Sequence, residues 1–323
     1  MAEEPTIQSL PDDLCVSVQG NFEQEEAEKL GHIFLHMLKQ FSSRFDLSNL
    51  DGVTIASDYQ GALSKLDRGT VTSTTLQATD DRVLGVAMAP MVLRDGALKS
   101  HLVFNALIMN TLFKGSESEI RQGLHIVAHE CSHVEFNTKF DKCFPDISLK
   151  KVLPSITEML RFNAGQSAWD EYFATLSSAS FGDSGSEAYR ETFLTELALT
   201  ENVVFESLKS YQLHGDVAKT IEEVGSTLGR LMKFSGYLIG DSLGKNMEPI
   251  DIDEISQTLE HSWFKPYFNS LVKNLKALNE NYGEWSSFNL FDAILINYDS
   301  LLEHFGVIVE NSDTPSPYVH FYK

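Results

Sequence analysis

The stretch GLHIVAHECSHVEFN, residues 123–137, constrains this chain more than any other part of its sequence. His125, His129 and His133 follow one another at intervals of four residues, and Glu130 stands directly after the second histidine. Apolar residues recur at helical spacing through the same stretch, which predicts an α-helix with one face in the core. Three imidazoles and a carboxylate would then lie on neighbouring turns of that helix.

The ends and the buried face of this helix can also be predicted. Ser116 and Glu119 have the spacing of a capping box, so we expect the helix to begin directly after Ser116. Its apolar stripe consists of Ile120, Leu124, Val127, Cys131 and Val134. Because Cys131 belongs to this stripe, we interpret it as a small buried hydrophobic residue rather than a redox switch.

The five residues His129-Glu130-Cys131-Ser132-His133 form an H-E-x-x-H motif. Helical residues four apart lie on one face, so His129 and His133 can point at one spot. Neutral imidazole nitrogens bind Zn²⁺ at about 2.0–2.1 Å. Glu130 is rotated by about 100° from His129, so it can reach a metal-bound water without binding the metal itself. The motif thus predicts two zinc ligands and a general base.

A catalytic zinc site needs a third protein ligand and keeps one position for water. We predict Glu171 for this role, because it lies 38 residues after His133 on the next strong helical pattern. Small residues on its face would let two helices approach: Ala168, Ala174, Thr175 and Ser178. Asp170 is the alternative ligand, although a shift of one residue turns the side chain by about 100°. The alternative role for Glu171 is that of an ordinary solvent-facing acid.

Residues around this motif are candidates for lining a cleft. We expect His125 to line it, with a further ligand or a donor to a ligand as the alternatives. Tyr172 and Asn105 are further cleft candidates. An oxyanion also needs a hydrogen-bond donor. The sequence does not distinguish among several candidates for that role: His214, His261, Tyr282, His304, Tyr318 and His320.

The rest of the chain predicts an α+β fold. We expect a flexible leader over residues 1–20, a metal-binding domain over 21–182, and an all-helical domain over 183–323 with an extended tail. The metal-binding domain would hold a helix at 21–41, a small mainly antiparallel sheet at 51–109, and the motif helix. A further helix is expected over about 155–180. Arg94–Ala97 has the turn residues of a hairpin.

Composition restricts the partners and the compartment. The chain carries 25 basic and 46 acidic residues, a formal charge of −21, which argues against a nucleic-acid partner. The apolar run at 83–93 is too short to span a bilayer, so no membrane association is expected. The three cysteines form no CxxC motif, and the N-terminus is no secretory signal. These features favour a cytoplasmic setting, and they do not indicate an oligomeric state.

The HECSH motif, followed by a glutamate on a later helix, resembles the zincin metallopeptidases, and more narrowly their gluzincin arrangement. The order of elements over residues 21–180 is similar to a minimal zincin core. The resemblance implies an edge strand that binds extended substrate, for which His101–Ala106 would be the counterpart. Around Glu171 the chain reads DEYFA rather than Asn-Glu-x-x-Ser-Asp. Compact intracellular zincins of bacteria and phages are the alternative resemblance.

Together the motif and the resemblance imply a zinc-dependent peptidase whose substrate is a peptide or protein. Zinc held by His129, His133 and Glu171 would lower the pKa of its water. Glu130 would take the proton and pass it to the leaving amine. The first alternative is a zinc-stabilised interaction protein that uses its helical C-terminal half to bind a partner. The second is a chance motif in a helical structural protein.

Overall fold

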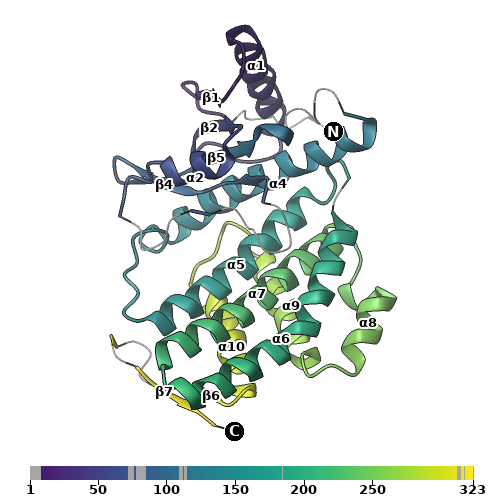
Figure 1. Ribbon diagram of the computed structural model, residues 1–323. Coiled ribbons are helices and arrows are strands. Elements are labelled where there is room, and N and C mark those ends of the chain that lie inside the picture. Colours follow the sequence, from purple (N-terminus) through teal and green to yellow (C-terminus); the bar gives the residue numbers. More distant parts are fainter. Residues whose placement is uncertain are drawn as a thin grey trace. The chain divides into compact units, whose positions relative to one another are not determined.

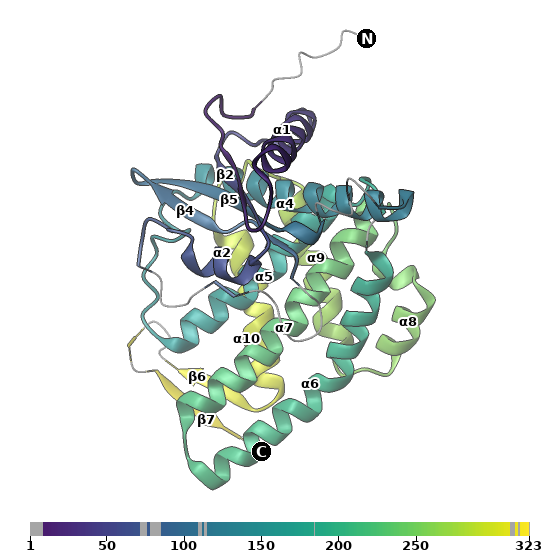
Figure 2. The ribbon, with the colours of Figure 1, turned by 45° about the horizontal axis from the view of Figure 1, so that its top comes forward.

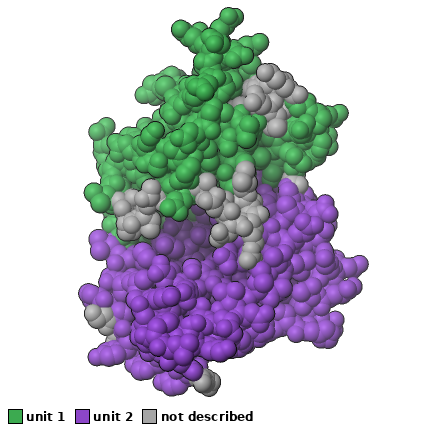
Figure 3. Space-filling view, viewed as in Figure 1, with its two compact units in different colours: residues 1–151, 180–184 green, residues 152–179, 185–323 purple. Residues whose placement is uncertain are grey.

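The computed structural model describes residues 9–71, 76–77, 85–108, 112, 115–183, 185–310, 314–315 and 317–322 (Figure 1). It is mixed α/β and mainly helical, in agreement with the expected class at that level. The chain divides into two compact units, which Figure 3 shows in different colours. Unit 1 comprises Met1–Lys151 and Ser180–Ser184, and unit 2 comprises Val152–Ala179 and Gly185–Lys323. The division therefore does not follow the predicted boundary between residues 182 and 183.

Unit 1 consists of a small sheet with helices on both of its faces. Its elements are β1 (Val16–Gln19), α1 (Gln24–Phe41), β2 (Leu50–Ala56), α2 (Tyr59–Lys65), β3 (Ala87–Met88), β4 (Met91–Arg94), β5 (Ala97–Asn105) and α4 (Glu117–Cys143). Leu102 and Phe104 of β5 pack in one core cluster with side chains of α1 and α4. Val103 points to the opposite face, where it packs with Tyr59 and Leu63 of α2. The ribbon in Figure 2 shows α1, α2 and α4 around this sheet.

The sheet is mixed, so the expectation of a mainly antiparallel sheet is wrong. Its strands lie in the order β1-β2-β5-β3, and β4 also pairs with β5. The β1–β2 and β2–β5 pairs are parallel, whereas β3 and β4 run antiparallel to β5. The parallel pairs arise because the chain crosses over through α1 between β1 and β2, and through α2 before it reaches β5.

The segment His101–Ala106 is not an edge strand that could add a peptide substrate. Its part in β5 pairs with β2 on one side, and Val103 and Phe104 pair with β3 on the other. The amides of His101 and Asn105 donate to the carbonyls of Pro90 and Val86. A strand with neighbours on both sides has few free backbone groups to pair with an added peptide.

Two local predictions for unit 1 are confirmed and two are wrong. The hairpin turn lies between β4 and β5, with Asp95 at φ 51° and Gly96 at φ 79°, the left-handed pair that a type I′ turn requires. Helix α1 also forms within the predicted range. Tyr59–Lys65 is helical where we expected strand, because Asp58 caps it by accepting from the Gly61 amide. Within the predicted flexible leader, Val16–Gln19 forms a sheet strand.

Unit 2 is a helical assembly that ends in a two-stranded sheet. Its elements are α5 (Ile156–Ser178), α6 (Ser186–His214), α7 (Val217–Gly244), the 3₁₀ turn η1 (Pro249–Asp251), α8 (Asp253–Glu260), α9 (Lys265–Asn279), α10 (Asn289–His304), β6 (Val307–Glu310) and β7 (Tyr318–Phe321). The antiparallel β6–β7 pair corrects the expectation of an all-helical half with an extended tail. No described helix has the length and apolarity that a bilayer crossing requires.

Helices α5 and α7 of unit 2 pack with their backbones in close contact. A Cβ atom at Gly236 would overlap the carbonyl oxygen of Ala168, and one at Gly240 would overlap that of Tyr172. One turn further on, a Cβ at Gly244 would lie 2.6 Å from the Leu176 carbonyl oxygen. These glycines recur every four residues along one face of α7, which lets its backbone lie against α5. This contact explains why α5 groups with unit 2.

Replacing Gly236 by alanine should destabilise unit 2, because the new methyl group must displace the backbone of α5. Overpacking of this kind costs about 1–3 kcal/mol, which we expect as a lower urea midpoint of unfolding. Gly31 in α1 is a suitable control, because a Cβ there would meet its nearest atom only at 3.9 Å. Gly31→Ala should be neutral or stabilising by up to about 1 kcal/mol. Equal midpoints for the two variants would contradict the close packing.

Candidate metal centre

The motif helix α4 begins with the predicted capping box. The Ser116 hydroxyl accepts from the Glu119 amide, and the Glu119 carboxylate accepts from the Ser116 amide at 2.7 Å. Val127, Cys131 and Val134 lie in the core cluster of unit 1. Because the cap and the apolar stripe fix both the start and the rotation of α4, the motif side chains have a defined direction within unit 1.

His129 and His133 lie together on α4, with their Nε2 atoms 3.1 Å apart. The two rings are nearly perpendicular, at 84°, and both side chains are buried. Two nitrogen ligands at about 2.0–2.1 Å from one tetrahedral ion would lie about 3.3 Å apart. Without an ion, the same separation allows one Nε2–H to donate to the other Nε2. The pair therefore has the spacing that a shared metal ion requires.

Glu130 is buried beside this pair, and its charge acts on two neighbouring groups of unit 1. Burial raises the pKa of the Tyr59 hydroxyl, and the negative charge of Glu130 raises it further. Burial and Glu130 together also raise the pKa of the Cys131 thiol. The Tyr59 hydroxyl is buried and has no hydrogen-bond partner among the described residues. A phenol donor thus lies within the electrostatic field of the predicted base.

His125 is buried one turn before His129 and is held by the chain segment that follows α5. Its Nδ1–H donates to the carbonyl of Phe181 at 3.2 Å, since a carbonyl can only accept. The Phe181 ring packs against Phe41 and Phe45. Arg121 of α4 forms an ion pair with Asp183 at 3.1 Å. His125 therefore has a structural partner of its own, and the segment Phe181–Asp183 is fastened to α1 and α4.

Glu171 lies on α5 and belongs to unit 2, whereas the histidine pair belongs to unit 1. Its carboxylate is buried, with Oε1 3.3 Å from Nζ of Lys233 on α7. Asp170, the alternative ligand, is half-buried. Tyr172 is completely buried and packs edge-on against Phe173, as a core residue does. The Asn105 side chain accepts from the Leu107 amide at the end of β5.

The candidate oxyanion donors lie at scattered places in unit 2. His214 accepts from the Asp216 amide at the end of α6, and His261 ends α8. Tyr282 packs against Phe173, and His304 stacks on Trp263. Tyr318 and His320 lie on β7. Each position has a local structural explanation, so none of these contacts selects an oxyanion donor.

Two residues near the predicted site were missed by the sequence argument. Tyr59 precedes the motif by 70 residues, and only the tertiary fold brings it into the field of Glu130. Lys233 follows Glu171 by 62 residues and lies on α7. The hydrophobic pattern of the sequence does not indicate that this helix packs against α5. Neither residue belongs to a local motif, so no signal in a single sequence could have identified them.

Comparisons with known proteins found no relative of this chain. No family model, no curated protein and no solved structure matches the chain. The chemistry of the site must therefore be argued from its own residues.

Thiol reactivity should report on the burial of the motif helix. Cys131 is fully buried with a raised pKa, whereas Cys15 is exposed. We expect the Cys15→Ser/Cys143→Ser double variant to resist a disulfide reagent at pH 8 and to react fully in urea, because only the thiolate attacks. The Cys131→Ser variant should react quickly in its native state through Cys15. Rapid native labelling of Cys131 would show that this face of α4 is open.

Proposed function

We propose that this chain is a zinc-dependent peptidase whose metal ion is held by His129, His133 and Glu171. The observation that carries the proposal is the buried imidazole pair, with Nε2 atoms 3.1 Å apart, and a buried glutamate between the two histidines in sequence. Burying three such groups costs free energy unless each is paired or binds a metal. A divalent cation shared by the imidazoles would offset that cost.

Support for Glu171 as the third ligand comes from its chemistry and burial. It joins His129 and His133 in a group of side chains whose ligand atoms could hold one metal ion. The carboxylate has two oxygens, so one can bind the ion while Oε1 stays near Lys233. Two neutral imidazoles and one carboxylate leave a net charge of about +1 on Zn²⁺, a ligand set typical of catalytic zinc. This donor set also favours zinc over the hard cations Ca²⁺ and Mg²⁺.

When bound, zinc would polarise a scissile carbonyl and lower the pKa of water at the site. Glu130 would accept the proton of the attacking water and donate it to the leaving amine. The buried Tyr59 hydroxyl is suited to donate a hydrogen bond to Glu130 or to the substrate. The proposal that the substrates are peptides rests on the resemblance of the HECSH motif and its later glutamate to the zincins.

The group of three potential ligands also favours catalysis over a purely structural zinc site. Structural sites are closed by four protein ligands, whereas catalytic sites keep one position open. A structural site also has no use for a buried base between its two histidines. The alternative of a zinc-stabilised interaction protein therefore differs in one measurable property, the ability to hydrolyse peptides.

The proposed metal site predicts that each chain binds one zinc ion tightly. After exhaustive dialysis, mass spectrometry of the native protein should find one zinc in the wild type and none in His129→Ala. Glu171→Gln should weaken zinc binding in a chelator competition, because an amide oxygen is a poorer ligand than a carboxylate. His36→Ala is the matched control, since His32 and His36 form an exposed i,i+4 pair on α1. Equal zinc content in wild type and His129→Ala would contradict the site.

If Glu130 is the general base, its substitution should reduce peptide hydrolysis without reducing zinc binding. Glu130→Gln should keep its zinc and lose about 10²–10⁴-fold in kcat, because it removes the base. A library of quenched fluorescent peptides supplies the assay. Glu135→Gln on the same helix is the control and should retain activity, because the contacts of Glu135, an ion pair with Lys139 at 2.7 Å and a hydrogen bond from the Asp46 amide at 3.3 Å, are structural. A zinc-loaded wild type that cleaves no peptide would support the interaction protein instead.

A further inference from the structure

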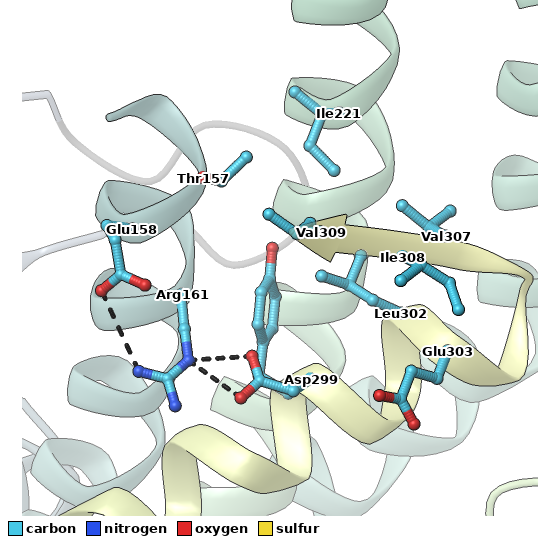
Figure 4. Close-up of a pocket in the computed structure, with 11 residues that line it drawn as sticks. Thr157, Glu158, Arg161, Ile221, Asp299, Leu302, Glu303, Val307, Ile308 and Val309 are labelled. Atoms are coloured by element: carbon cyan, nitrogen blue, oxygen red, sulfur yellow. Dashed lines mark hydrogen bonds and ion pairs between the residues drawn. The ribbon is translucent and has the colours of Figure 1, made fainter. Parts of the chain in front are cut away.

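A cavity of about 310 Å³ opens in unit 2, bordered by α5, α7, α10 and β6 (Figure 4). Its volume is that of a pocket for a small molecule. One wall is apolar and includes Ile221, Leu302 and Val307. Another part of the lining carries charged side chains from α5 and α10. A cavity with one apolar wall and one charged wall suits a ligand that has a hydrocarbon body and a charged head.

The sign of the charge on the ligand's head group can be inferred from the charged residues that line the cavity. Glu158, Asp299 and Glu303 provide three carboxylates against the one guanidinium of Arg161, a net charge of −2. The Nε of Arg161 donates to both carboxylate oxygens of Asp299, at 2.8 and 2.9 Å, and its Nη1 lies 4.0 Å from Glu158 (Figure 4). An anion would meet three carboxylates and an arginine that is already engaged. The lining therefore favours a cation.

The arrangement of the acids on α10 also favours a cationic ligand. Asp299 and Glu303 are four residues apart, so they lie on one face of the helix, and both line the cavity. Like charges at this spacing repel each other. Of these two acids on α10, Arg161 pairs with Asp299, whereas Glu303 is exposed and forms no ion pair among the described residues. A cation placed beside Glu303 would relieve this repulsion.

We propose that this cavity binds a small alkylammonium compound, with its ammonium group beside Glu303 and Asp299 and its hydrocarbon chain against Ile221, Leu302 and Val307. The site is formed within unit 2 and is separate from the His129–His133 pair of unit 1. It does not depend on the proposed peptidase activity, so either proposal can fail alone.

The test is calorimetric titration of the full-length protein with hexylammonium, 1-hexanol and hexanoate, which share one chain length. We expect saturable binding of hexylammonium, about tenfold tighter than that of hexanol, and no binding of hexanoate. The affinity should fall as salt is raised, because the head group lies near the surface. Failure of hexylammonium to bind, or equal affinity for hexanol, would overturn the proposal.

Variants locate the binding to the cavity. Glu303→Gln should weaken hexylammonium at least about threefold without affecting folding, because an exposed substitution changes stability little. Leu302→Trp should fill the cavity and abolish binding. Glu260→Gln on α8 removes an exposed acid outside the lining and should bind like the wild type. Unchanged affinity in Glu303→Gln would contradict the site, even if Leu302→Trp fails to fold.

A lysine side chain of another polypeptide carries the same head group as a small amine. Nα-acetyl-lysine-N-methylamide distinguishes the two sources, because it presents that side chain with its peptide groups. We expect it to bind more weakly than hexylammonium, since its polar backbone must stay outside the apolar wall. Tighter binding of the lysine derivative would assign the cavity to a protein partner and overturn the small-amine proposal.

Discussion

The close approach of α7 to α5 is the contact on which the arrangement of unit 2 depends. Gly236 and Gly240 remove the side chains that would hold the two backbones apart. The same contact places Lys233 beside Glu171, so a buried carboxylate on α5 has a cation from its neighbour. The cavity proposed to bind an amine also lies along these two helices. The close contact between α5 and α7 thus positions both the candidate metal ligand Glu171 and the candidate amine-binding cavity.

The buried polar groups of the HECSH motif are costly in an apolar environment. His129, Glu130 and His133 are all less than a tenth exposed, and Glu130 perturbs the ionisation of Tyr59 and Cys131 around it. Groups of this kind are retained when they are paired or when they bind a metal. Because an ion would be bound by the folded chain and not by the unfolded one, its binding would also stabilise the fold. The motif would then link function to stability.

The sequence predicted those features that depend on nearby residues. The capping box at Ser116, the left-handed turn at Asp95 and Gly96, and the stripe through Cys131 each involve residues a few positions apart. Their geometry follows from local sterics and helical spacing, so a single sequence contains the information.

Features that depend on distant partners could not be predicted in this way. The parallel pairing of β1 with β2 requires a four-residue strand within an apparently loose leader to find its partner. The central position of β5 was obscured by the zincin resemblance, which implied an edge. Small residues on α5 were expected to admit the motif helix, and nothing in the sequence indicated that Ala168 would also pack against Gly236 of α7. The spacing of small residues predicts a close helix contact without identifying the partner.

The return of the chain to unit 1 at residues 180–184 affects how this protein can be synthesised. Phe181 completes an aromatic cluster with Phe41 and Phe45, and Asp183 pairs with Arg121. Unit 1 is therefore discontinuous: its last segment leaves the ribosome only after the whole of α5. An N-terminal domain usually folds before the next one emerges. Here the nascent unit 1 must wait for a helix that belongs to its neighbour, which couples the folding of the two units in time.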